Sequence, residues 1–321
     1  MFENAPVWAI TAYFDPLGSS RRLSAYREFR RRLNVPLITV ELAFDGDFQL
    51  SQADADILIQ LRGGSVLWQK ERLLNIALQA LPESCDTVAW LDCDVVFVRD
   101  GWAAEARREL NEFALVQPFD RLYYLNADDA TRAPNSGREN DYFDSFASRL
   151  AHGTLPEQAF HMVAASRQYR YAPGIAWVAR RSTLAEHGLY DAGVIGGGDS
   201  LLQAAACGHH ADRATALRMN PRQRRHYEEW AHRFHQDVRG RISYVEGSVL
   251  HLWHGDLSDR RYKERHEGFE RFEFDPQEDL AYTADGTWCW NSDKPELHAY
   301  VKAHFEGQDR AWRAALTGAV K

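Results

Sequence analysis

The chain has 321 residues and a net charge of −8 at neutral pH, a length that fits one large α/β domain or two modest ones. The acidic balance argues against a general nucleic-acid binder, and there is no apolar run of about eighteen residues to predict a membrane span. The start lacks the basic and apolar regions of a signal peptide, and the four cysteines form no zinc-binding pattern. We therefore expect a soluble, reduced, cytoplasmic protein.

Apolar runs alternate with amphipathic segments in the first part of the chain. Strands are predicted over 6–13, 37–42, 57–61, 88–97 and 114–117, and helices over 20–33, 66–81 and 101–110. Ser19 or Ser20 would cap the first helix, and Pro82 would end the second. This alternation indicates an α/β fold with a mostly parallel central sheet and helices on both faces.

The rest of the chain is less regular. The segment 126–158 is rich in Asp, Asn, Arg and Gly, which indicates an excursion or a lid. Beyond it, strands are predicted over 174–179 and 242–253, and helices over 182–187, 201–207, 221–238 and 295–305.

Two aspartates, Asp92 and Asp94, lie within the apolar run 88–97, which predicts a buried strand that breaks at its carboxyl end, where the two acids would emerge into a crevice. Burying unpaired carboxylates is unfavourable, so two of them beside a buried strand indicate a counter-charge. Open α/β sheets bind ligands at the carboxyl ends of their strands, and paired carboxylates there suit Mg²⁺ or Mn²⁺ shared with substrate phosphates. The alternative is a strand end whose acids accept backbone hydrogen bonds in a turn.

Three glycines at 196–198 precede Asp199 at the start of a predicted helix. Glycines permit positive φ and close backbone approach, so a bulky group is expected nearby. Asp199 is either an N-cap of the helix or a general base at the floor of a crevice.

Two histidines, His251 and His254, lie at the end of the last predicted strand. Residues three apart on a strand point to opposite faces, so the two are not expected to bind one ion. His254, beside Gly255, is the better third ligand for an ion that two carboxylates hold.

Basic residues on two helices are candidate contacts for a nucleotide. Arg261 and Arg265 share a helix face, and paired guanidinium groups suit phosphate oxygens. Lys70 and Asn75 lie on the helix before the acidic motif. For Lys70, surface pairing with Glu71 or Glu83 is the alternative.

Together these motifs resemble those of the GT-A nucleotide-sugar glycosyltransferases, over roughly residues 7–271. The match consists of hhhDxD from Trp90 to Asp94, the glycine turn with Asp199, and the late His254, in the order of the galactosyltransferase-type enzymes. The resemblance implies a GT-A fold over 1–273, with a nucleotide-binding half at about 1–118 and an acceptor half at about 119–273. Residues 274–321 would form a C-terminal extension with a helical tail.

The resemblance also implies roles for the metal and for the base. Asp94 would bind Mn²⁺ or Mg²⁺ directly, Asp92 would contact the ribose or the metal shell, and His254 would complete the ion's ligands. Asp199 would deprotonate the acceptor hydroxyl, which implies inversion at the anomeric carbon. Members of that group often carry two acids in a row after their glycines, whereas this chain has only Asp199 there. A mechanism that retains the anomeric configuration by internal return therefore stays open.

The remaining implied contacts are divided between donor and acceptor. The donor nucleotide, a UDP-sugar by the resemblance, would be contacted by Tyr13, Phe14, Lys70, Asn75, Arg261 and Arg265. The acceptor would be contacted by Trp177, Gly197 and Gly198. The expected acceptor is a glycan hydroxyl. The alternative is a 5-hydroxymethyl base of phage DNA, extruded from the duplex and held through the Arg- and His-rich stretch 213–241.

A haloacid-dehalogenase-type phosphohydrolase is the second alternative. The segment 92–96 also fits its DxDx[TV] nucleophile motif, and Gly198-Asp199 resembles its later acidic motif. That later motif needs a second acid a few residues on, where Leu202, Gln203 and Ala204 stand. A sugar-nucleotide pyrophosphorylase and a sugar-binding module lack comparable support, since the first strand is not followed by a Gly-rich basic loop and a binding module needs no metal beside a base.

Overall fold

The computed structural model describes residues 6–16, 20–44, 46–126, 142–163, 165–253 and 262–305 of the chain. The strands are β1 (Trp8–Phe14), β2 (Leu37–Ala43), β3 (Ile57–Arg62), β4 (Thr87–Leu91), β5 (Val95–Phe97), β6 (Leu115–Gln117), β7 (Arg121–Tyr124), β8 (Phe143–Ser145), β9 (Tyr171–Ala172), β10 (Ala176–Arg180), β11 (Ile242–Tyr244), β12 (Ser248–His251), β13 (Leu280–Tyr282) and β14 (Trp288–Trp290). The α-helices are α1 (Ser20–Arg32), α2 (Lys70–Gln79), α3 (Trp102–Glu109), α4 (Phe146–Ala151), α5 (Ala165–Gln168), α6 (Arg181–His187), α7 (Gly198–Cys207), α8 (His210–Ala216), α9 (Pro221–Val238), α10 (Tyr262–Phe269) and α11 (Pro276–Asp279). A further helix covers residues 295–305.

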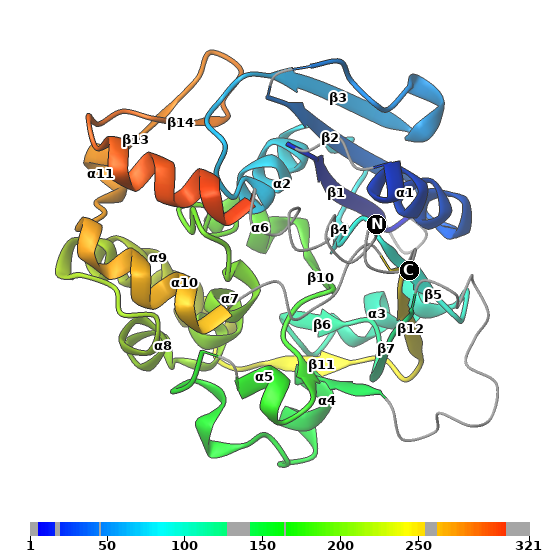
Figure 1. The fold of residues 1–321 in the computed structure, drawn as a ribbon. Coiled ribbons are helices and arrows are strands. Elements are labelled where there is room, and N and C mark those ends of the chain that lie inside the picture. The colour runs from blue at the N-terminus through cyan, green and yellow to red at the C-terminus, as the bar shows by residue number, and fades with distance from the viewer. Residues whose placement is uncertain are drawn as a thin grey trace, which may run out of the picture.

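A seven-stranded sheet runs through the molecule, with its strands in the order β11-β6-β10-β4-β1-β2-β3 (Figure 1). Neighbouring strands pair in parallel except at β10, which runs antiparallel to both β4 and β6. The strand that leads to the acidic motif, β4, is an inner strand with every residue buried. The predicted mostly parallel central sheet is confirmed.

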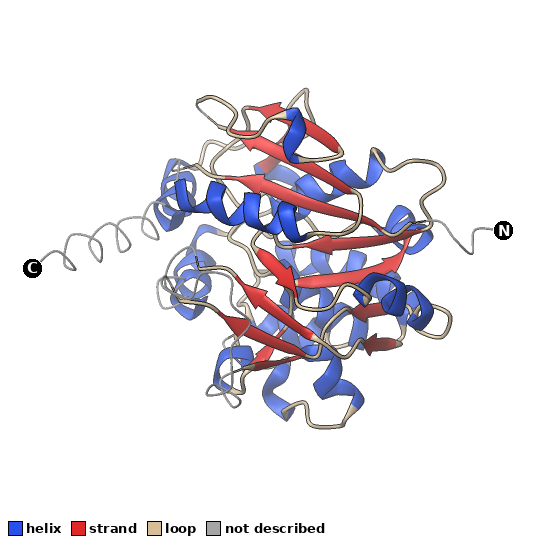
Figure 2. Cartoon of the chain, turned by 90° about the vertical axis from the view of Figure 1, so that its right-hand side faces the viewer, coloured by secondary structure: helices blue, strands red, loops and turns tan. Residues whose placement is uncertain are grey.

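The two faces of this sheet belong to two separate hydrophobic cores. Ile10 and Phe14 of β1 lie in one core, whereas Ala9 and Tyr13 lie in the other, because successive side chains of a strand point to opposite faces. The first core also contains residues of α2, α7 and α9, and the second contains residues of α1 and α3. Helices therefore pack on both faces of the strands, as predicted (Figure 2).

A second sheet of five strands, in the order β5-β12-β7-β8-β9, continues from the end of β4. Since β5 begins at Val95, the residues of the acidic motif form the link between the two sheets. The predicted single strand over 242–253 is wrong. Its first part is β11 in the central sheet and its second part is β12 in the second sheet, with Gly247 at a φ of +148° between them.

The segment expected to form an excursion or a lid is folded where the structure describes it. β8 pairs with both β7 and β9, and α4 follows it directly. Ser145 caps α4 by accepting a hydrogen bond from the backbone of Ser148, and Phe146 is fully buried. Residues 143–151 are therefore a strand of the second sheet and a helix anchored by the buried residues 145–147, rather than a lid. The other part of the expected lid, residues 127–141, lies outside the described residues.

Residues 274–305 pack into the same core as the central sheet. Leu280 and Trp288 of the β13–β14 hairpin are buried there, together with Leu297, Val301 and Phe305 of the final helix. In Figure 1 this segment is orange to red and lies beside α2 and α9. The domain boundary after residue 273 stays a prediction, but this part of the extension shares its hydrophobic core with residues 1–273.

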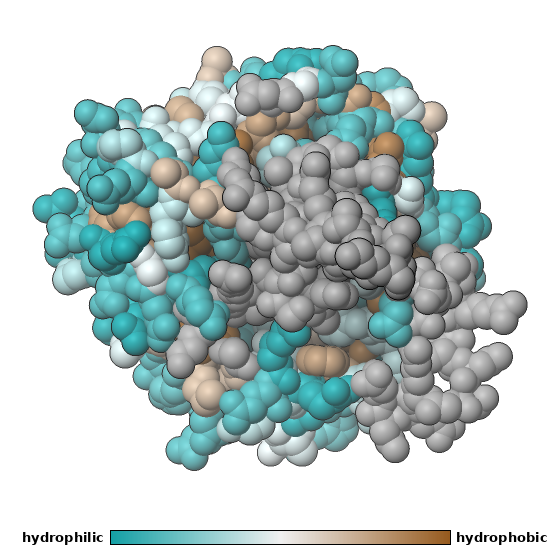
Figure 3. All heavy atoms as spheres, in the orientation of Figure 1, coloured by the Kyte–Doolittle hydropathy of each residue, from teal (hydrophilic) through white to brown (hydrophobic). Residues whose placement is uncertain are grey.

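The face drawn in Figure 3 is largely hydrophilic outside the residues in grey. Of the large hydrophobic side chains that the structure describes, Val98 and Tyr282 are exposed, at 47% and 56%. Among the described helices, none combines the length and the apolar character needed to cross a bilayer. Most of the chain's apolar surface is therefore used in its own core.

Candidate active site

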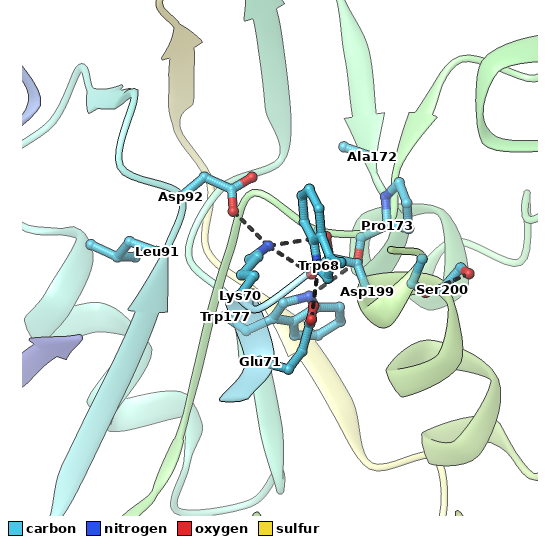
Figure 4. Close-up of polar contacts among 12 residues, drawn as sticks. Trp68, Lys70, Glu71, Leu91, Asp92, Ala172, Pro173, Trp177, Asp199 and Ser200 are labelled. Atoms are coloured by element: carbon cyan, nitrogen blue, oxygen red, sulfur yellow. Dashed lines mark hydrogen bonds and ion pairs between the residues drawn. The ribbon is translucent and has the colours of Figure 1, made fainter. Parts of the chain in front are cut away.

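The acidic motif begins at the carboxyl end of β4. The backbone N–H of Asp92 donates a 2.8 Å hydrogen bond to the carbonyl oxygen of Ile175, just before β10. On the other side of β4, Thr11 Oγ1 of β1 donates a 2.7 Å bond to the carbonyl of Leu91. Both neighbouring strands therefore hold the strand end from which the Asp92 side chain points toward α2 and α7 (Figure 4).

Lys70, the first residue of α2, lies between two of the predicted site carboxylates (Figure 4). Its Nζ is 2.6 Å from Asp92 Oδ1 and 3.2 Å from Asp199 Oδ2. The Lys70 side chain is only 12% exposed, so water screens these contacts poorly. The structure thus brings together three of the residues that the sequence singled out, from the start of α2, the end of β4 and the start of α7.

One ammonium group does not balance the carboxylates around it. Burial alone would lower the pKa of Lys70, but Asp199, Asp92 and Glu71 hold it well above its usual value. Burial, together with the charges of Asp199 and Asp94, raises the pKa of Asp92 to about 6 despite its 2.6 Å contact with Lys70. The site therefore has a surplus of negative charge, which a bound cation would neutralise.

Asp94 lies next to the imidazole of His251 in β12. Its side chain is 11% exposed, and Oδ1 is 3.7 Å from His251 Nε2. His251 Nδ1 is 3.0 Å from the carbonyl oxygen of Leu252, which can only accept, so Nδ1 is the nitrogen that carries the proton. A metal-binding histidine typically donates its other ring N–H to such a carbonyl, so the orientation of His251 suits a metal beside Asp94.

A complete set of protein ligands is not present in the described residues. No group of three or more His, Cys, Asp or Glu side chains among them is arranged to hold a metal ion. Mg²⁺ is commonly held by one or two carboxylates together with substrate phosphates, a pattern that Asp92 and Asp94 fit. His254, the predicted third ligand, lies outside the described residues.

Asp199 stands in the first turn of α7, directly after the glycine turn. Gly196 and Gly197 have φ values of +83° and +96°, a left-handed conformation that glycine adopts without strain. The N-cap of α7 is Gly197, so the reading of Asp199 as the N-cap is wrong. Near a helix N-terminus, the backbone N–H groups favour the negative charge of the Asp199 carboxylate.

The loop before β10 touches both Asp92 and Asp199, and the sequence-based prediction did not include this loop in the site. A Cβ added to Gly174 would lie 2.2 Å from Asp199 Oδ2, so only glycine leaves room for that carboxylate. Ile175, whose carbonyl binds Asp92, has a φ of +79°, which is unfavourable for a β-branched residue. The buried Gln117 holds the loop by donating to the carbonyl of Gly174 at 3.1 Å. Backbone strain of this kind is typical of functional sites.

Glu71 and Trp68 form another side of the site that the sequence did not predict. Trp68 Nε1 donates a 2.8 Å hydrogen bond to Glu71 Oε2. The Trp68 ring also meets Phe14 edge-on, with 5.6 Å between ring centroids, and stacks on Phe305 at 6.4 Å. Phe14 is thus next to the site, and its predicted contact with the base stays a prediction.

Three predicted contacts need correction. The Tyr13 side chain is fully buried in the core opposite Phe14, with its hydroxyl bonded to Gln49, so it does not face a nucleotide. Trp177 is also fully buried, and its Nε1 donates to the carbonyl of Pro173, so its side chain supports the loop before β10 instead of touching an acceptor.

Asn75 is the third correction. Its Oδ1 accepts from the backbone of Leu189, and its Nδ2 donates to the carbonyl of Leu189 and to Asp191 Oδ2, at 2.8 to 3.0 Å. The side-chain amide therefore holds the segment 189–191 and does not face the donor.

Arg265 of α10 lies against the glycine turn. A Cβ at Gly196 would lie 3.5 Å from its guanidinium nitrogens, and the residue is 8% exposed. This brings a buried positive charge next to the turn that precedes Asp199. The contact of Arg265 with donor phosphates stays a prediction, and Arg261 lies outside the described residues.

No protein-family model and no curated protein sequence matches the chain. Among solved structures, similar chains include glucosyl-3-phosphoglycerate synthase from Mycobacterium tuberculosis in complex with Mn²⁺, uridine diphosphate and phosphoglyceric acid. That match has 13% identity over 84% of this chain and 76% of the other, with a TM-score of 0.36.

Two further similar structures are also transferases or synthases by name. The catalytic domain of Drosophila β1,4-galactosyltransferase 7 in complex with xylobiose matches with 10% identity over 91% of this chain and 96% of the other (TM-score 0.39). Mannosyl-3-phosphoglycerate synthase from Rubrobacter xylanophilus matches with 12% identity over 90% and 87% (TM-score 0.37). By their names, these three similar structures are two synthases of sugar phosphoglycerates and one galactosyltransferase. At these identities the likeness concerns the fold alone.

Proposed function

We propose that this chain is a glycosyltransferase that moves a sugar from a nucleoside diphosphate, a UDP-sugar, to an acceptor hydroxyl group with the help of Mn²⁺ or Mg²⁺. The observation that carries the proposal is the group of carboxylates around Lys70 at the carboxyl end of β4. Such a group lies where open α/β sheets bind ligands. Its surplus negative charge suits a divalent ion that bridges the protein to a diphosphate.

The residues we expect to hold the ion are Asp92 and Asp94, with His254 as the predicted further ligand. The orientation of His251 next to Asp94 supports a metal in this region. When bound, the ion would neutralise the charge that builds on the leaving diphosphate. The Arg265 guanidinium, buried beside the glycine turn, would add a hydrogen-bond donor for phosphate oxygens.

The base in the proposed reaction is Asp199. The bond between the anomeric carbon and the diphosphate oxygen breaks, a bond from the acceptor oxygen to that carbon forms, and the acceptor's proton passes to the Asp199 carboxylate. Attack from the face opposite the diphosphate inverts the anomeric carbon. The acceptor that we propose is a hydroxyl group of a glycan, with the hydroxymethylated DNA base as the alternative.

The test is thermal unfolding of the protein with UDP-glucose, UDP-galactose and UDP-N-acetylglucosamine, each with and without Mn²⁺. A ligand at about a hundred times its Kd adds about 2.7 kcal/mol and raises the midpoint of unfolding. We expect a rise that depends on Mn²⁺ and that disappears in the Asp94→Ala variant. If no nucleotide sugar raises the midpoint, the proposal is wrong, and hydrolysis of p-nitrophenyl phosphate would then favour the phosphohydrolase.

A further inference from the structure

Glu71 is a buried carboxyl group at the site with no role in the reaction proposed above. It follows Lys70 in the first turn of α2, and the residue is 6% exposed. A Cβ added to Gly198 would lie 2.0 Å from Glu71 Oε1, so the carboxyl group lies against the backbone of the residue before Asp199. The absence of a side chain at position 198 is what allows this approach.

A small cavity joins Glu71 to Asp199. It has a volume of about 10 Å³ and is lined by Lys70, Glu71, Leu74, Trp90, Leu189, Tyr190, Gly198, Asp199 and Leu202. That is about the space that one water molecule needs. Lys70, Glu71 and Asp199 therefore line one small space whose other walls are mostly apolar.

The charges that face Glu71 come from several elements. Lys70 on α2 and Asp199 on α7 are the nearest, the Tyr190 phenol lines the same cavity, and Arg265 and His266 of α10 lie at the glycine turn. Burial raises the pKa of Glu71 to about 7; Asp199 raises it too, while Lys70 and the Trp68 hydrogen bond oppose the rise. Glu71 therefore changes its charge close to neutral pH.

Lys70 holds Asp199 less tightly than it holds Asp92. The distance from Nζ to the nearest oxygen is 3.2 Å for Asp199 and 2.6 Å for Asp92. A carboxylate that accepts a proton from an acceptor hydroxyl must not be neutralised by a neighbouring cation. The Glu71 carboxylate acts on Lys70 through its charge rather than through an ion pair, and it repels the negative charge that Asp199 loses on protonation.

We propose that Glu71 is a positioning residue of the transfer reaction: its carboxylate repels the negative charge of Asp199, and so favours the passage of the acceptor's proton to Asp199. This inference rests on the proposed glycosyltransferase function. In the ionised form of Glu71, proton transfer to Asp199 is favoured. In the neutral form, the repulsion between Glu71 and Asp199 is absent.

The experiment measures the pH dependence of UDP release from UDP-glucose, or from whichever of the three nucleotide sugars above binds, with Mn²⁺ present and water as the acceptor. For the unchanged protein we expect kcat to rise by about threefold to tenfold as the pH passes through about 7. In Glu71→Gln, which keeps an oxygen to accept from Trp68, we expect the low rate at every pH and an unchanged affinity for the donor. Glu83→Gln, an exposed change just beyond the end of the same helix, should behave like the unchanged protein.

A second variant tests whether the protonation of Glu71, and not the shape of its side chain, sets the pH profile. Trp68→Phe removes the hydrogen bond that favours the ionised form of Glu71, so the midpoint of the pH profile should move to higher pH. A purely structural role of Glu71 predicts no such movement. If Glu71→Gln fails to fold, the movement of the midpoint in Trp68→Phe decides.

The outcomes separate this inference from the function on which it rests. If no nucleotide sugar binds the unchanged protein, the proposed function is wrong. If the unchanged protein releases UDP and Glu71→Gln keeps the same pH profile, only the role of Glu71 is wrong. An unmoved midpoint in Trp68→Phe also overturns that role.

Discussion

Single residues at this site are held in states that would be unfavourable elsewhere in the protein. Glu71 is buried and Asp92 is largely buried, and the pKa values of both carboxyl groups are raised mainly by burial although the charge of Lys70 opposes the rise. Ile175 has a backbone conformation that its branched side chain disfavours, yet its carbonyl fixes Asp92. Such costs at a site, offset by packing elsewhere, are what binding a charged ligand requires.

The raised pKa of Glu71 predicts how the stability of the protein depends on pH. The folded state keeps a proton up to a pH of about 7, whereas the unfolded chain releases it near 4.5, so the free energy of unfolding falls as the pH rises between these values. In Glu71→Gln, which has no titrating carboxyl group at this position, this decrease in the free energy of unfolding is absent. Without metal and nucleotide, we expect the variant to be more stable than the unchanged protein at pH 8, by about 1–3 kcal/mol.

Urea unfolding at pH 5 and pH 8 checks this prediction. At pH 5 Glu71 is protonated in the folded protein and resembles glutamine, so the two proteins should differ little. The exposed Glu83→Gln serves as the matched control at both pH values. A Glu71→Gln protein that is less stable at pH 8 would contradict the direction of the pKa shift.

At the scale of elements, the start of α2 is held by the β13–β14 hairpin. The Gln69 side chain donates to the carbonyl of Trp288 at 2.8 Å and accepts from its N–H at 3.1 Å, as a neighbouring strand would. Arg72 donates to the carbonyl of Gly286 at 2.6 Å and lies 4.3 Å from the centroid of the Tyr282 ring. The residues on both sides of Lys70 are therefore tied to the hairpin.

Gln69→Ala should therefore loosen the site as well as the fold. The change leaves the buried N–H of Trp288 without its partner, which costs about 1–3 kcal/mol, and it removes one of two hydrogen bonds to the Trp288 carbonyl, which keeps the N–H of Ser65. We expect a lower midpoint of unfolding and a weaker Mn²⁺-dependent affinity for nucleotide sugars. Gln79→Ala, on the exposed end of α2, is the control. Equal donor affinity in the two variants would show that the hairpin does not position Lys70.

Helices and strands that local residue types specify could be predicted from the sequence. Helix and strand ends that depend on hydrogen bonds to residues far along the chain could not. The buried run of β4 and the glycine turn before α7 are visible in the sequence because their residue types alone specify strand and turn. The helix expected from residue 66 begins instead at Lys70, since Ser65 and Gln69 bond to Trp288 and the N–H of Trp68 donates to Val194. No local pattern reveals these partners.

The same limit applies to the site. Lys70, Asp92 and Asp199 were singled out by residue type and position. In the structure, Lys70 Nζ lies 2.6 Å from Asp92 Oδ1 and 3.2 Å from Asp199 Oδ2. Glu71 was missed because an acid beside a lysine on a helix resembles an exposed pair. Gly174 and Ile175 were missed because they looked like the beginning of a strand.

For the molecule as a whole, buried residues of the segment 274–305 belong to the same hydrophobic core as residues of the central sheet. The prediction that follows is that a chain ending at residue 273 does not fold cooperatively, because it leaves the partners of Leu280, Trp288 and Leu297 exposed. A chain ending at residue 305 keeps all these contacts. Thermal unfolding followed by circular dichroism compares the two. A cooperative transition and nucleotide-sugar binding in the shorter chain would make 274–321 a separable extension.

The contact between Gln69 and Trp288 joins residues that are 219 positions apart. A chain emerging from the ribosome exposes its N-terminal part first, so the acidic motif and Lys70 are synthesised long before the hairpin that fixes the start of α2. Until then the buried carboxylates lack the rigid arrangement of their counter-charge. The proposed donor binding is therefore expected to require the nearly finished chain, so that a growing fragment that already carries the acidic motif would not yet sequester nucleotide sugar.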